Sequence, residues 1–295
     1  MSEPKEVSQP RMANFQAWED SATHDRQTLA ERIASEVFLA ALGSTETFRK
    51  KVFLKGGVLV GAVYESGRNT ADLDFSTVLK PSKDFLAKLE AELVTALPAA
   101  AAQVGSPETI IKVQSVKYRP RPETFVEANA PAIEVKFAYA SRGSKNEERL
   151  KSGNSSNVIY ADISFNEEIC SVEEICIGNT GLSFFAYSKV DLIAEKLRST
   201  LQQKTRQRNR RQDIYDLWFL LTQYPVSPQE ELEIKEAFVI KCQVRGIVPD
   251  AKSFADPEIA ERSKSEWSTL AVEVNNLPEF DVAFAVVSNF YAALW

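Results

Sequence analysis

The hydrophobic periodicity of this chain changes once, near residue 180, and that change constrains the fold more than any other feature. Before it, short apolar or alternating segments predict strands at 52–54, 71–78, 110–117, 132–140 and 158–165. After it, apolar residues recur every three or four positions and predict helices at 188–203, 213–224, 228–239 and 283–294. This order predicts a mixed α/β (α+β) fold whose first part holds a sheet and whose second part is helical.

Three helices are predicted among the strands. Their apolar spacing places them at 28–42, 58–64 and 83–97, with Gly43 and Pro98 expected to end the first and the third. The basic, proline-rich loop KYRPRP separates the strands 110–117 and 132–140, which we expect to be neighbours in the sheet. The expected organisation is a flexible N-terminal segment over 1–26, a sheet domain over 27–180 and a helical domain over 181–295.

The chain contains a single histidine, His24, and this excludes several classes of enzyme. Ser-His-Asp and Cys-His sites need a histidine beside the nucleophile, and HExxH or Cys/His zinc sites need more than one. The groups that remain are carboxylates, lysines, arginines and backbone amides. These groups are typical of Mg²⁺-dependent phosphoryl or nucleotidyl transfer.

Composition predicts a cytoplasmic protein without a membrane partner. No run approaches the ~18 apolar residues of a spanning helix, and the first residues lack the apolar core of a signal peptide. The cysteines Cys170, Cys176 and Cys242 form no pattern and are expected to be reduced thiols. A net charge of −6 argues against a protein that coats DNA.

The segment FLKGGVLVGAVYESGRNTADLDFS, residues 53–76, combines a Gly-Gly turn with a DxD strand in one strand–helix–strand unit. Gly56 and Gly57 permit close backbone approach, and amides at the start of the following helix can bind a triphosphate. Asp72 and Asp74 project from the same face of a strand, where a divalent cation would offset their repulsion. Either motif alone fits an ordinary turn or a solvated carboxylate pair, whereas both together favour a metal–nucleotide site.

A two-metal site needs a third carboxylate from a neighbouring strand. Asp162 interrupts the apolar alternation IYADISF and is the first candidate, and Glu134 in AIEVKF is the second. In two-metal catalysis Asp72 and Asp74 would bridge both ions. Asp162 would bind the ion that activates the acceptor hydroxyl and would also serve as its base.

A second polar segment extends from Ser188 to Leu221. Lys196 lies beside its apolar stripe and can meet a triphosphate as a point charge. Asp213 and Asp216 lie three residues apart on one helix face, and they follow a basic run made of Lys204, Arg206, Arg208, Arg210 and Arg211. Each charge alone is typical of a solvated loop or a helix cap, but beside a metal site the run can hold phosphates of a nucleotide or of RNA.

These motifs resemble those of the AbiEii-type nucleotidyltransferase toxins, a family of the DNA polymerase β-like nucleotidyltransferase superfamily that is similar to the MenT toxins. The pattern LKGG…R…DLDFS matches residues 54–76, and the pattern AEKLR…R…RDxYDLW matches residues 194–218. The resemblance covers about Thr28 to Tyr224. It implies a polymerase β-like mixed sheet with helices, followed by an α-helical C-terminal domain.

The resemblance also implies roles for individual residues. Gly57, with Gly56, would approach the triphosphate, and Asp72 and Asp74 would bind Mg²⁺. Lys196 would contact the nucleotide, Asp213 would belong to the active site, and Asp162 fits the third acidic position.

The chain departs from the family pattern at two positions. Val58 stands where the family has Thr or Ser, and Gln212 where it has Arg. Arg211 is the substitute candidate for nucleotide binding, although a shift of one residue turns a helical side chain by about 100°.

The activity that the resemblance implies is the transfer of a nucleoside monophosphate from a nucleoside triphosphate, with Mg²⁺ or Mn²⁺, to an acceptor. For several members the acceptor is the 3′ end of tRNA, which stops translation, and a cognate antitoxin restrains the toxin. We therefore expect an RNA acceptor, tRNA first, and an antitoxin protein, in a toxin–antitoxin or phage-defence pair. The alternatives are a small-molecule or protein hydroxyl as acceptor, and a nucleotide-binding regulator without turnover.

Overall fold

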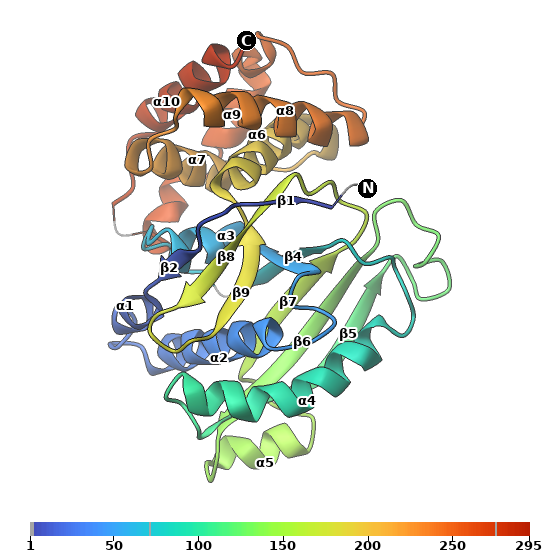
Figure 1. Cartoon of the computed structure of the whole chain (residues 1–295). Helices are drawn as coiled ribbons and strands as arrows, with labels where there is room; N and C mark the ends of the chain where they lie inside the picture. Colours follow the sequence, from blue (N-terminus) through green and yellow to red (C-terminus); the bar gives the residue numbers. More distant parts are fainter. Residues whose placement is uncertain (1–2, 71, 275) are drawn as a thin grey trace. The chain divides into compact units, whose positions relative to one another are not determined.

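A computed structural model describes residues 3–70, 72–274 and 276–295 (Figure 1). The chain forms two compact units, Met1–Glu65 with Thr70–Ala186, and Ser66–Asn69 with Tyr187–Trp295. The predicted division at residue 180 thus falls six residues before the one observed. The short segment Ser66–Asn69 of the first half belongs to the second unit, which no periodicity in the sequence indicates.

The first unit is built on a mixed sheet, in which the described strands follow the order β1-β8-β9-β3-β4-β7-β6-β5, with β2 beside β8. β3 and β4 are antiparallel, β4 and β7 are parallel, and β6 is antiparallel to both β7 and β5. The bounds are β1 (Lys5–Glu6), β2 (Arg11–Ala13), β3 (Val52–Lys55), β4 (Leu73–Thr77), β5 (Thr109–Arg119), β6 (Ala132–Ser141), β7 (Val158–Ser164), β8 (Ser171–Ile177) and β9 (Ser183–Tyr187).

The predicted neighbours β5 and β6 pair from Thr109↔Ser141 to Arg119↔Ala132, which confirms that prediction. The predicted strand start at Ala71 lies outside the described residues, and β4 begins at Leu73. The sequence does not predict β8, because the strand SVEEICI buries a carboxylate. Glu173 accepts a hydrogen bond from the hydroxyl of Tyr64 at 2.7 Å, so an acidic residue occupies an interior position.

The N-terminal residues, which the sequence predicts as a flexible segment, contain β1, β2 and α1 (Phe15–Asp20) in the structure. β1 and β2 both pair parallel with β8. Arg11 of β2 donates to Glu173 at 3.2 Å. These strands are too short to show a period of their own, and it is pairing with a distant strand that stabilises them.

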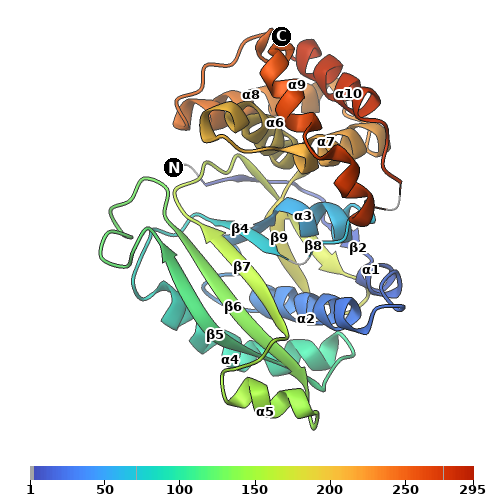
Figure 2. The same cartoon turned by 180° about the vertical axis from the view of Figure 1, so that it is seen from behind.

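The helices α2 (Arg26–Gly43) and α4 (Phe85–Gln103) cover one face of the sheet (Figure 2). Phe38 of α2 packs in the core against Phe75 of β4 and Phe137 of β6, with ring centroids 6.1 and 4.6 Å away. The helix α5 (Lys145–Lys151) is short, and α3 (Gly56–Val58) continues into a π-helical turn over Leu59–Val63.

The prediction that Pro98 ends its helix is wrong, because α4 continues through it to Gln103. Pro98 removes one backbone hydrogen bond. The alanines that follow are the strongest helix formers, and Leu89 and Leu93 bury one side of the helix. Packing and propensity together therefore outweigh the cost of the proline.

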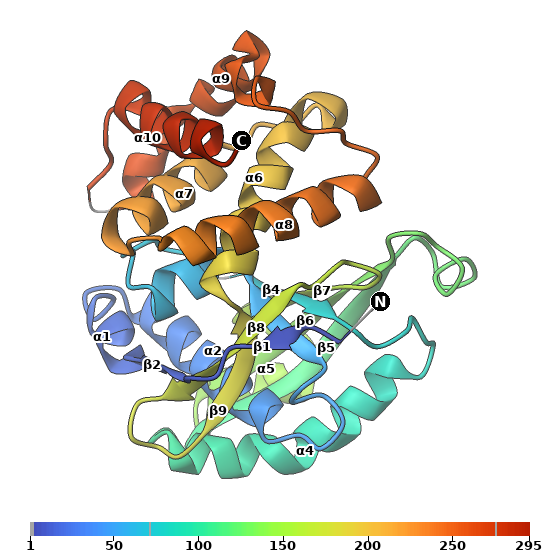
Figure 3. The same cartoon turned by 45° about the horizontal axis from the view of Figure 1, so that its top comes forward.

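The second unit contains five longer helices among its described residues (Figure 3). α6, α7, α8 and α10 correspond to the four predicted helices, whereas α9 is not predicted. The hydroxyl of Tyr291 donates to the carbonyl of Asp250 at 2.7 Å, and its ring stacks on Phe254 at 4.4 Å. The bounds are α6 (Lys189–Arg206), α7 (Arg211–Gln223), α8 (Pro228–Val244), α9 (Pro257–Lys264) and α10 (Phe280–Ala293).

No helix in the described part of the chain is both long and apolar enough to cross a membrane. The three cysteines are reduced thiols, as the sequence predicts.

Candidate active site

The glycine turn lies directly beside the DxD strand. The chain leaves β3 at Lys55 and turns into α3 at Gly56, whose φ of +74° strains any L side chain. A Cβ built on Gly56 would lie 2.9 Å from the Cβ of Asp74, closer than such atoms approach. The structure therefore brings Gly56 and Asp74 together, and it leaves space at the carboxylate that only glycine provides.

Three carboxylates form a row across the sheet. Asp74 of β4 pairs in register with Asp162 of β7, and Asp162 pairs with Glu134 of β6. Residues directly opposite one another on paired strands project from the same face of a sheet. The neighbouring positions along β4 and β7, Phe75 and Ile163, are buried on the other face. The first unit thus carries a row of acidic groups on the face opposite its aromatic core.

Asp72 precedes β4 by one residue and is exposed. Partial burial of its carboxyl and the negative charge of Glu134 raise the pKa of Asp72. Glu134 is therefore close enough to Asp72 to repel it. Both candidates for the third carboxylate, Asp162 and Glu134, belong to the same acidic surface.

Asp162 forms an ion pair with Arg119 of β5. Arg119 is in register with Ala132 of β6, so its side chain crosses β6 over a small residue to reach β7. Among the residues that the structure describes, no three His, Cys, Asp or Glu side chains converge closely enough to hold a metal ion. The acidic row suits Mg²⁺, because its carboxylates supply oxygen donors from one face of the sheet. Asp162 can become a ligand only after its ion pair with Arg119 has broken.

The sequence reasoning missed Glu167, three residues beyond the end of β7. Glu167 forms an ion pair with Lys55, and the hydroxyl of Ser76 donates to it at 2.6 Å. Lys55 is also in register with Asp74. Glu167 therefore holds the ammonium group of Lys55 at the end of the acidic row that lies beside Gly56.

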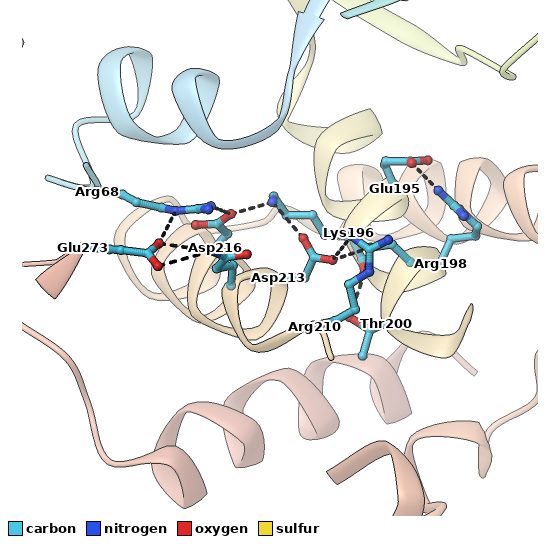
Figure 4. Close-up of polar contacts among 11 residues, drawn as sticks. Arg68, Glu195, Lys196, Arg198, Thr200, Arg210, Asp213, Asp216 and Glu273 are labelled. Carbon is cyan, nitrogen blue, oxygen red and sulfur yellow. Dashed lines mark hydrogen bonds and ion pairs between the residues drawn. The ribbon is translucent and has the colours of Figure 1, made fainter. Parts of the chain in front are cut away.

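The second unit contains a buried ion cluster (Figure 4). Lys196 of α6 donates to Asp213 at 3.2 Å and to Asp216 at 2.6 Å, both on α7. Arg68, from the segment Ser66–Asn69, donates to Asp216 at 2.6 Å. Lys196 is 5% exposed and Asp216 is completely buried. The structure therefore brings the predicted site residues Lys196 and Asp213 together.

Four further residues complete this cluster and keep its charge balanced. Ser199 donates to Asp213 at 2.6 Å, and Arg210 lies 3.6 Å from the same carboxylate. Glu273 lies 3.7 Å from Arg68 and accepts from Gln212 at 3.2 Å. The three cations Lys196, Arg68 and Arg210 thus face the three carboxylates Asp213, Asp216 and Glu273, which offsets the cost of burying them.

The cluster keeps Lys196 and Asp213 charged. Burial opposes the charge of Lys196, but Asp216 and Asp213 outweigh it, so the pKa of Lys196 is raised. Burial also opposes the charge of Asp213, but Lys196 and Arg210 outweigh it and lower the pKa of Asp213. The sequence reasoning placed Arg68 in a motif without a role, because its partner Asp216 lies on a helix far along the chain.

The residues of the basic run in the second unit have different surroundings. Arg211 forms an ion pair with Glu266 at 3.1 Å, and Lys204 forms ion pairs with Asp256 at 2.9 Å and Glu258 at 3.1 Å. Arg206 differs from both. Its partial burial and its arginine neighbours lower its pKa, the neighbours being Arg245, Arg198, Arg208 and Arg210.

Two solved structures from Helicobacter pylori are similar in fold. The crystal structure of JHP933 aligns with a TM-score of 0.51 and 13% identity, over 92% of each chain. A putative nucleotidyltransferase aligns with a TM-score of 0.50 and 13% identity, over 92% of this chain and 95% of that chain. The nucleotidyltransferase toxin MenT4 of Mycobacterium tuberculosis H37Rv aligns with a TM-score of 0.44 and 14% identity, over 95% and 99% of the two chains.

No curated protein matches the sequence. A family model described as "Nucleotidyl transferase AbiEii toxin, Type IV TA system" matches residues 37–286, from α2 into α10. The match includes the glycine turn, the acidic row and the ion cluster. Because it extends over most of the sequence, the chain belongs to the AbiEii nucleotidyltransferase toxin family.

Proposed function

We propose that this protein transfers a nucleoside monophosphate from a nucleoside triphosphate to the 3′-hydroxyl of an RNA, with tRNA as the acceptor, using Mg²⁺ or Mn²⁺. Family membership supplies the reaction class and the toxin class. The observation that carries the site is the row of Asp74, Asp162 and Glu134 beside the open turn at Gly56.

The chemistry of this site follows from its donors. A bound divalent cation would supply charge neutralisation for the triphosphate. Asp72 and Asp74 would hold it, with Asp162 or Glu134 as the third carboxylate. Gly56 and Gly57 would admit the phosphates, since neither has a side chain. The acceptor hydroxyl attacks the α-phosphorus, pyrophosphate leaves with the broken P–O bond, and Asp162 accepts the hydroxyl proton.

We assign Lys196 a contact with the nucleotide, as the motif match implies. Its ammonium has three N–H donors, of which Asp213 and Asp216 accept two. Asp213 and Asp216 keep the ammonium of Lys196 charged, so its third N–H can donate to a phosphate oxygen. Asp213 would position the lysine. Arg211 is a weaker candidate for nucleotide binding, because Glu266 already pairs with it.

An RNA acceptor is supported by Arg206 and Arg208, which are exposed members of the basic run. The double variant Arg206→Glu with Arg208→Glu should reduce transfer to RNA more than tenfold, with a weaker salt dependence. The double variant Lys83→Glu with Lys88→Glu changes the net charge equally at exposed positions of the first unit, and it should transfer normally. Equal losses in both variants would contradict a specific RNA contact.

The central experiment incubates the full-length protein with Mg²⁺, total tRNA and each of the four labelled nucleoside triphosphates in turn. Asp74→Asn should abolish labelling, whereas Asp84→Asn, an exposed Asp at the start of α4, should not. Label that appears only on added protein or small molecules would replace RNA as the acceptor. Triphosphate binding without any labelled product would instead identify a regulator without turnover.

A further inference from the structure

The strand β5 forms one edge of the sheet of the first unit (Figure 2). Within the described part of the chain, its only strand partner is β6. Its 11 residues span roughly 36 Å at about 3.3 Å per residue. An edge of this length presents a long row of backbone donors and acceptors to a further strand.

The charge of β5 decides which kind of strand can pair with it. Lys112, Lys117 and Arg119 are exposed, and the strand TIIKVQSVKYR contains no acidic residue. Two copies of β5 placed edge to edge would set cation against cation, which destabilises pairing. An acidic strand from another protein would instead be attracted to the Lys112 end of the edge, because Arg119 already pairs with Asp162 and Lys117 is in register with Glu134.

An apolar pocket of about 260 Å³ opens between α4 and β5. Leu93, Val94 and Leu97 line it from α4, and Ile110 and Val113 line it from β5. Val94 is 68% exposed, so a large apolar side chain of the surface is left in water at this place. Lys112, Arg142 and Glu90 also border the pocket, so its polar groups carry a net positive charge.

We propose that β5 and this pocket bind an extended acidic segment of a partner protein. The segment adds a strand to the sheet at β5 and inserts an apolar side chain between α4 and β5. Backbone hydrogen bonds supply its affinity, the pocket sets its register, and the cations of β5 select acidic residues. This surface adjoins the acidic row at one end, where Arg119 of β5 pairs with Asp162, whereas the pocket lies at the other end of β5, beside residues 109–113.

The test is selection of random 12-residue peptides displayed on phage against the full-length protein. We expect enriched peptides that alternate apolar and acidic residues. They should bind Val94→Asp and Lys112→Glu at least tenfold more weakly than the unchanged protein. Val248→Asp, at a position that is 92% exposed in the second unit, is the matched control and should bind normally.

Strand addition has its own signature. N-methylation of alternate backbone amides in the best peptide should abolish binding in one register and spare it in the other. Amides of β5 should exchange more slowly with solvent in the complex. The proposal is overturned by failure of any peptide to enrich, by enriched basic peptides, or by binding that Val94→Asp leaves unchanged. A dimer of the free protein that Val94→Asp dissociates in light scattering would assign the edge to a second copy instead.

Discussion

The ammonium of Lys196 lies 2.6 Å from the carboxylate of Asp216, which has no exposed surface. The same carboxylate accepts a hydrogen bond from Arg68 at 2.6 Å. One buried anion thus holds two cations, one of which the proposed function places on the nucleotide. Loss of activity at this cluster has to be separated from loss of folding, because a buried ion whose partner is removed is strongly destabilising.

Asp216→Ala should be the most damaging substitution in the cluster. It leaves Arg68 and Lys196 without their shared partner, and we expect the free energy of unfolding to fall by about 3–5 kcal/mol. Lys196→Met should cost less, because Asp216 keeps Arg68 and Asp213 keeps Arg210. Urea unfolding would measure both. Arg211→Met is the control, since its partner Glu266 is exposed and such pairs contribute about 1 kcal/mol or less.

Arg119→Ala should strengthen metal binding by the free protein. The substitution frees Asp162 from its ion pair, so a cation no longer competes with the arginine for that carboxylate. Mn²⁺ titration followed by electron paramagnetic resonance should show a dissociation constant several-fold lower than that of the unchanged protein. Arg121→Ala removes the same charge from an exposed loop position and should leave Mn²⁺ binding unchanged. Equal affinities in all three proteins would remove Asp162 from the metal site.

Gly56→Ala should abolish nucleotidyl transfer, because the added methyl group displaces the side chain of Asp74 from the proposed metal site. A Cβ at this position meets the Asp74 side chain, and the φ of +74° adds strain. Gly105→Ala is a matched control, because φ is +86° there and no atom lies within 4 Å of the added Cβ. Both variants should lose stability through strain, about 1–2 kcal/mol in thermal unfolding. Only Gly56→Ala should lose transfer to tRNA, so transfer that survives in it would contradict the assigned site.

Protein stability should decline between about pH 4.5 and pH 8 because of Glu36. Burial, then a hydrogen bond to Glu19 and its charge, raise the pKa of Glu36 from 4.5 to about 8. The folded state therefore keeps a proton that the unfolded state has lost. The resulting stabilisation is complete below pH 4.5, falls through this window and is gone above pH 8.

Glu36→Gln tests this titration, because glutamine resembles the protonated acid and does not ionise. The melting temperature of the variant should vary less with pH between 4.5 and 8 than that of the unchanged protein. The same slope in both proteins would show that Glu36 is not the group responsible.

The sequence predicts the elements of the first unit better than their arrangement. Alternation and glycine position were sufficient to locate β4 and β7, and hence Asp74 and Asp162. No local pattern, however, indicates that β4 lies between β3 and β7, and this order is what sets Asp74, Asp162 and Glu134 in one row. Strand order depends on contacts between distant residues, which a period of two does not encode.

Two of the misses, β8 and the ion cluster, have a common physical cause. β8 contains the buried Glu173, and the ion cluster unites Arg68 with residues of α6 and α7. In each case a polar group is buried because a distant partner satisfies it. Sequence patterns assign charged residues to the surface, so they do not predict β8 or the pairing of Arg68 with Asp216.

The segment Ser66–Asn69, which belongs to the second unit although it lies between β3 and β4 in sequence, has a consequence for synthesis. Arg68 leaves the ribosome long before α7, so the anion that pairs with it does not yet exist. The second unit can be completed only after the sheet domain has been translated, and neither unit corresponds to one uninterrupted length of chain. A gene cut at the domain boundary would therefore yield two fragments. The helical fragment would lack Arg68, the buried partner of Asp216.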